Sequence, residues 1–113
     1  MSELKCAIQF DENLWRDLNS EMDESGEIII GDNNNKVNIQ VMPISQYQFI
    51  PGFEKEIKVI VDFASQIALG LFVNWLYDKL KSIKADKVKI NSKIIKIEGK
   101  DALKKAIDEN EGG

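Results

Sequence analysis

The feature that most constrains the fold is a long apolar stretch in the middle of the chain. Between Phe53 and Ser82, the polar side chains of Lys58, Asp62, Gln66, Asn74 and Asp78 form a narrow stripe. This spacing predicts one helix over residues 53–82, roughly 43 Å long at about 1.5 Å per residue. A helix that is apolar around most of its circumference needs cover on most sides. The rest of the 113-residue chain is therefore expected to pack around it.

Shorter elements are predicted before this helix. Residues 4–10 are typical of a strand, and Asp11 is predicted as the N-cap of a short helix because its carboxylate can accept from the next backbone amides. Residues 28–30 and 37–41 are predicted to form a hairpin, since apolar and polar side chains alternate in the second run. The turn between them is rich in Gly, Asp and Asn, and Pro43 is expected to end the second strand.

A second hairpin is predicted after the helix. Residues 87–90 and 93–97 flank the two-residue turn Asn91-Ser92. This pairing places Val88 opposite Ile95, so that the apolar side chains of both strands share one face.

These elements predict a single α+β domain over residues 1–109, followed by a polar tail over residues 110–113. The expected order is β-α-ββ-α-ββ-α, with two antiparallel hairpins packed on one long central helix. The last helix is predicted to begin with Asp101 as its cap.

Composition excludes several classes of chemistry. The chain has no histidine and one cysteine, so imidazole bases, catalytic triads and mixed Cys/His zinc sites are excluded. Cys6 lies among apolar residues and is interpreted as a packed side chain. The acidic pairs Asp11-Glu12 and Asp23-Glu24 are interpreted as helix caps and solubilising groups, and residues 32–36 as a turn and not a calcium loop. We therefore predict no catalytic residue, no metal, no cofactor and no enzymatic activity. The lone cysteine and the absence of a signal pattern predict a cytoplasmic protein.

Charge is distributed unevenly along the chain. Residues 79–105 hold ten lysines against three acidic residues. One interpretation is an anion-binding face, carried by Lys84, Lys87, Lys89, Lys93 and Lys96. The other is a solvated hairpin whose lysines protect an edge strand. Arginine and aromatic residues are absent from this cluster, which argues against nucleic acid because nucleic-acid binders favour guanidinium groups and stacking rings.

The apolar segment also allows two interpretations. Val59–Tyr77 is long enough to cross a bilayer, but Asp62 would then lie in hydrocarbon, at a cost of about 2.5–3.5 kcal/mol. The alternative is a core helix that also contacts a partner or a second copy of the chain, because small residues let another helix approach closely. The residues predicted for that partner or oligomer surface are Ala64, Ala68, Leu71, Phe72 and Trp75.

The second half of the chain carries a series of motifs in one order. Pro51-Gly52 precedes the apolar segment 63–70 with its small residues, followed by Val73-Asn74-Trp75-Leu76, a charged hairpin and Asp101-Ala102-Leu103. Over about residues 51–109, this pattern resembles the effector-associated constant component proteins of bacterial conflict systems. The resemblance implies a non-enzymatic adaptor that works beside a separately encoded effector, and it implies no catalytic residues.

Two hypotheses of function follow. The first is a protein-interaction component, an adaptor or inhibitor in bacterial defence or counter-defence, with another protein or a second copy as its partner. The second is a binder of nucleic acid or an anionic membrane surface through the lysine face. A small-molecule substrate is not expected.

Overall fold

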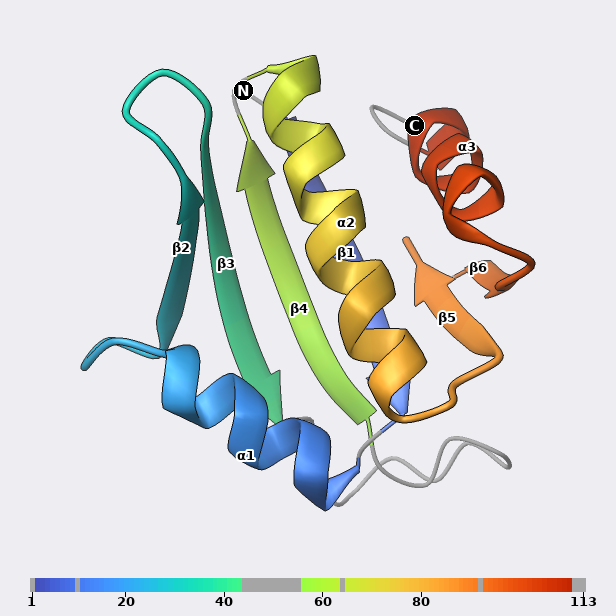
Figure 1. Cartoon of the computed structure of the whole chain (residues 1–113), viewed down its shortest axis with the longest axis horizontal. Coiled ribbons are helices and arrows are strands. Elements are labelled where there is room, and N and C mark those ends of the chain that lie inside the picture. Colours follow the sequence, from blue (N-terminus) through green and yellow to red (C-terminus); the bar gives the residue numbers. More distant parts are fainter. Residues whose placement is uncertain (1, 10, 44–55, 64, 92, 111–113) are drawn as a thin grey trace.

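The computed structural model describes residues 2–9, 11–43, 56–63, 65–91 and 93–110 (Figure 1). The chain is an α+β protein, as predicted. Its elements are β1 (Ser2–Gln9), α1 (Glu12–Glu21), β2 (Glu27–Gly31), β3 (Lys36–Pro43), β4 (Glu56–Phe63), α2 (Gln66–Ser82), β5 (Lys87–Ile90), β6 (Lys93–Lys96) and α3 (Lys100–Asn110).

The strands form one antiparallel sheet in the order β2-β3-β4-β1-β5-β6. Figure 1 shows α2 lying across one face of this sheet with α3 beside it, while α1 crosses the end of the sheet near the last turn of α2. Alternate strand residues are buried beneath the helices, and a single apolar core lies between the two layers. Its largest fully buried side chains are Phe72, Leu4, Ile8, Leu14, Leu18, Ile39, Ile57, Leu69, Leu76, Leu80, Ile90 and Leu103.

The predicted helix over residues 53–82 is wrong in its first half. Residues 56–63 form the central strand β4, and the helix begins only at Gln66, where the Ser65 hydroxyl oxygen accepts from the backbone N–H of Ala68 at 3.1 Å. The physical reason is a period of two. β-Branched and aromatic side chains of residues 57, 59, 61 and 63 are buried, while Lys58, Ile60 and Asp62 between them are partly exposed.

This correction changes the order of elements to β-α-β-β-β-α-β-β-α, and the two hairpins do not pack on one long helix. The proposed membrane span Val59–Tyr77 is divided between β4 and α2. Within the described residues, none of the helices combines the length and the apolar character that crossing a bilayer requires.

Most shorter predictions are confirmed. Asp11 is the N-cap of α1, its carboxylate accepting from the backbone N–H groups of Asn13 and Leu14. Both hairpins form, and Val88 lies opposite Ile95. Pro43 is the last residue of β3.

The C-terminal predictions need two corrections. The last helix begins at Lys100, so Asp101 lies inside its first turn and is not the cap. Of the predicted tail, Asn110 is the last residue of α3, and residues 111–113 lie outside the described part of the chain, as do Ser92, Ala64 and the Pro51-Gly52 motif.

One lysine joins α1 to α2. The ammonium group of Lys79 lies 2.6 Å from a carboxylate oxygen of Asp17 and 2.6 Å from one of Glu21, and its side chain is only 13% exposed. It also lies 5.7 Å from the centre of the Trp75 ring. Burial acts to lower the pKa of Lys79, but the hydrogen bonds to Asp17 and Glu21 outweigh burial, and the pKa is raised above its ordinary value.

We expect Lys79→Met to lower the free energy of unfolding by about 1–2 kcal/mol, because charge-assisted hydrogen bonds at a partly buried site are lost. Because the folded-state pKa is raised, this contribution is present below the ordinary pKa of 10.5 and is lost as the pH rises through the folded value. Urea unfolding at neutral and at strongly alkaline pH measures both effects. Lys81→Met, at an exposed position of the same helix, is the control and should change little. Equal losses of unfolding free energy for Lys79→Met and Lys81→Met would contradict a stabilising role for the ion pairs of Lys79.

Candidate interaction surface

One face of the sheet carries no helix in the part of the chain that the structure describes. We call it the open face. Its side chains alternate with those of the core, and none of them is fully buried. They are Lys5, Ala7, Glu27, Ile29, Lys36, Asn38, Gln40, Met42, Lys58, Ile60, Asp62, Lys87, Lys89, Ile94 and Lys96.

Lysines from four strands gather on the open face. Lys58 on β4 and Lys89 on β5 flank Ala7 of β1 in a single row across the sheet. Lys87 on β5 lies directly opposite Lys96 on β6. Lys5 lies on β1, two residues from Ala7 and therefore on the same face.

The sequence predicted only part of this cluster. Lys87, Lys89 and Lys96 are brought together, but Lys93 is at a core-facing register position of β6, opposite Ile90, with its side chain exposed. Lys84 lies in the turn after α2 with φ 55°. These two lysines are therefore not part of the open face.

Sequence reasoning missed Lys5 and Lys58. Each lies between buried apolar neighbours on a central strand, Lys5 between Leu4 and Cys6, and Lys58 between Ile57 and Val59. The signal that could have found them is this period-two alternation, which the predicted helix concealed for Lys58.

The open-face lysines have no acidic partner among the side chains that the structure describes, apart from Lys89, which makes a contact of its own. Apolar side chains interrupt the lysines. Met42 ends the row that holds Lys58, and Ile94 ends it on the other side; they are 42% and 55% exposed. The face is thus basic with exposed apolar groups, which is a composition that can bind an acidic surface carrying apolar residues.

Of the residues predicted for a partner surface on the apolar helix, the structure places two in the core. Ala68 and Phe72 are 0% exposed and belong to the core. Trp75 is partly buried, packs against the core and stacks on Phe72 with 6.0 Å between ring centres. Leu71 is 36% exposed and is the described residue of that set whose side chain is most open to solvent.

In the part of the chain that the structure describes, Cys6 and the acidic residues singled out from the sequence have structural roles. Cys6 is 2% exposed, as predicted for a packed side chain, and burial raises the pKa of its thiol to about 12. The pKa of Asp23 is lowered by hydrogen bonds, first from the Ser25 hydroxyl and then from the backbone of Glu27. Asp32 accepts from the backbone N–H groups of Asn34 and Asn35, which confirms a turn. The described residues include no group of three or more potential ligands arranged to hold a metal ion.

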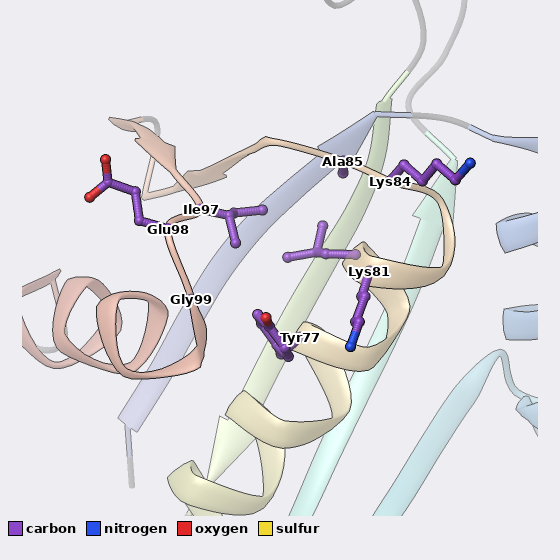
Figure 2. Close-up of a pocket in the computed structure, with 8 residues that line it drawn as sticks. Tyr77, Lys81, Lys84, Ala85, Ile97, Glu98 and Gly99 are labelled. Carbon is purple, nitrogen blue, oxygen red and sulfur yellow. The ribbon is translucent and has the colours of Figure 1, made fainter.

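A shallow pocket of about 400 Å³ lies between α2, the turn that follows it and the connection from β6 to α3 (Figure 2). Tyr77, Leu80 and Ile97 contribute apolar walls. Figure 2 shows the charged ends of Glu98 and Lys84 pointing away from each other and away from Tyr77. Because its polar groups do not converge, this pocket lacks the arrangement that a small-molecule site requires.

Comparison with known proteins finds no matching family model, no matching curated protein and no matching solved structure.

Proposed function

We propose that the chain is a non-enzymatic protein-interaction component, an adaptor or inhibitor, that binds an acidic protein partner through the open face. The observation that carries this proposal is the position of Lys5 and Lys58. Both lie on central strands of the sheet, β1 and β4. Lysines that protect a sheet from unwanted pairing lie on edge strands, so that role does not account for these two.

The stability of the fold does not account for the cluster either. Lys87 and Lys96 lie directly opposite each other, and like charges in that position destabilise a strand pair. Met42 and Ile94 leave much of their apolar surface in water. An acidic partner would offset the lysine charges, and apolar groups on it would cover these two side chains.

The apolar side chains favour a protein over a nucleic acid. Met42, Ile60 and Ile94 lie among the lysines, and a phosphodiester backbone offers nothing apolar to cover them. No arginine or aromatic residue is among the described residues of the open face. Nucleic-acid surfaces commonly combine guanidinium groups with rings that stack on bases.

The proposed role in bacterial defence or counter-defence rests on the resemblance of residues 51–109 to the effector-associated constant component proteins. Of its motifs, Val73-Asn74-Trp75-Leu76 lies in α2, where Val73 and Leu76 contribute to the core. Asp101-Ala102-Leu103 lies in the first turn of α3. The resemblance supports an adaptor role, and the open face supplies the surface that such a role needs.

The test is binding to model anions, measured by fluorescence anisotropy at about 0.15 M salt. The probes are a random copolymer of glutamate and leucine, polyglutamate, single-stranded and duplex DNA, and phosphatidylserine vesicles. We expect the glutamate–leucine copolymer to bind most tightly, because it adds apolar side chains to the acidic groups that polyglutamate also carries. The double variant Lys5→Glu/Lys58→Glu should weaken that binding at least about tenfold, since like charges then face the probe.

The matched control is Lys104→Glu/Lys105→Glu. It changes the net charge by the same amount, but at exposed positions of α3. It should leave the affinity for the copolymer within about twofold. Tighter binding of DNA or vesicles than of the copolymer would replace the proposal with the nucleic-acid or membrane alternative. Equal loss in both double variants, or binding to none of the probes, would overturn the open face as an interaction surface.

A further inference from the structure

The two edges of the sheet differ in their side chains. The outer strands are β2 and β6. Lysines stand at both ends of β6, and lysines on an edge strand disfavour its pairing with a further strand. Residues 28–31 at the β2 edge carry no charge, so β2 lacks this protection.

Backbone hydrogen bonds show which groups of β2 face outward. The N–H of Val41 donates to the carbonyl of Gly26, so the Gly26 carbonyl faces β3. At Glu27, the carbonyl accepts from the N–H of Asp23 at 2.9 Å and the N–H donates to the Asp23 carboxylate at 3.0 Å, so Glu27 faces outward and is already bonded. The direction alternates along an antiparallel strand. The N–H and C=O of Ile29 are therefore the next pair on the outer edge.

Exposed apolar side chains flank this edge on both faces of the sheet. Ile29 is 50% exposed on the open face. On the helix side, Leu71 is 36% exposed and reaches β2, since a Cβ atom added to Gly31 would lie 3.3 Å from its Cδ1. Ile67 lies one turn earlier on the same side of α2 and is 66% exposed. The edge thus combines outward-facing backbone groups with apolar surface on each side.

We propose that two copies of this chain pair through β2, antiparallel and about a twofold axis, to form one continuous sheet. The occupant is a second copy because residues 28–31 are apolar or glycine and bring no like charges together when they pair with themselves. Asp23 occupies the edge at Glu27, so the second strand lies against residues 28–31. The axis then passes at Ile30, with Ile29 opposite Gly31 of the second copy, and Leu71 and Ile67 of both copies lie over the joint.

Sedimentation equilibrium of the full chain over a wide concentration range tests the pairing. We expect a dimer, with Ile29→Lys raising its dissociation constant at least about tenfold because two charges enter an apolar edge. Ile94→Lys is the matched control, since Ile94 is 55% exposed on the same face but on β6. It should leave the dissociation constant unchanged. A monomer at every concentration, or equal weakening by both variants, would overturn the proposal.

Disulfide cross-linking tests the register. Cys6 is buried and its pKa is raised to about 12, so Ile30→Cys carries one reactive thiol. At the twofold axis the two positions form a non-hydrogen-bonded pair with about 4.5 Å between Cα atoms, within the range that a disulfide spans. Mild oxidation should give a covalent dimer of Ile30→Cys and none of Ile94→Cys. Failure of Ile30→Cys to cross-link, or equal cross-linking of both, would overturn the register.

The dimer proposal and the open-face proposal can be tested independently of each other. Lys5→Glu/Lys58→Glu lies on strands away from the β2 edge and should leave the dimer intact. Ile29→Lys should leave the affinity of each chain for the glutamate–leucine copolymer unchanged. That result would show that the β2 edge and the open face act separately. Loss of dimer by the lysine double variant as well would overturn the β2 edge as the sole site of pairing.

Discussion

Replacing Phe72 with alanine is expected to lower the free energy of unfolding by about 3–5 kcal/mol. Phe72 is 0% exposed and is among the largest buried side chains of the core. Its ring packs on Trp75 with 6.0 Å between ring centres, so truncation also removes an aromatic contact. Urea unfolding followed by circular dichroism measures the loss.

The matched control is the preceding residue. Leu71→Ala should cost less than about 1 kcal/mol, since this side chain is 36% exposed and loses less buried area. Both variants are measured at protein concentrations below the dissociation constant of the proposed dimer, so that pairing does not contribute to the free energy of unfolding. Similar losses at the two positions would contradict the one-sided burial of α2 and would restore a helix buried all round.

Gly31→Ala is expected to lower the free energy of unfolding by about 3 kcal/mol or more. Gly31 has φ 91°, where an L side chain is strained. A Cβ atom there would also lie 2.0 Å from the backbone carbonyl oxygen of Asn35, so the turn would have to move. The Asn35 side chain accepts a hydrogen bond from the Ser65 hydroxyl, the N-cap of α2, so that movement would also disturb the start of the helix.

Comparison with Gly26→Ala separates the cost of backbone strain from the cost of steric overlap. Gly26 has φ 80°, but nothing lies within 4 Å of a Cβ atom built on it. Gly26→Ala should therefore cost only the strain of the left-handed backbone, about 1–2 kcal/mol. Both variants are compared by thermal unfolding. If Gly26→Ala costs as much as Gly31→Ala, close contact at the β2–β3 turn is not what makes Gly31 necessary.

Local patterns predicted the hairpins well, because their signals lie within a few residues. Asp11 as a cap and Val88 opposite Ile95 both follow from spacing alone. The prediction for residues 53–82 was wrong because an apolar run does not by itself distinguish the periodicity of a strand from that of a helix. A central strand covered by helices on one face, followed by a helix beginning at Gln66, has nearly the same composition as one long helix. The alternation across residues 57–63 was the better guide.

The candidate surface could be predicted only in part for a related reason. Lys87, Lys89 and Lys96 are near each other in sequence, so a local charge count found them. Lys5 and Lys58 join them only through the pairing of β1 with β4 and β5, which no local pattern contains. The edge at β2 likewise depends on the strand order, because three consecutive isoleucines look the same at an edge or in the centre.

The position of β1 has a consequence for how the chain folds. β1 precedes the other described strands in the sequence, yet it lies between β4 and β5, with Ser2 opposite Phe63. Among the described strands, β1 alone joins the β2-β3-β4 half of the sheet to the β5-β6 half. At about 5–20 residues per second, a ribosome would leave β1 without its neighbours for on the order of several seconds. Such distant pairing gives a high contact order, which slows folding. During synthesis, the core-facing side chains of β1 therefore stay without their strand neighbours until β4 emerges.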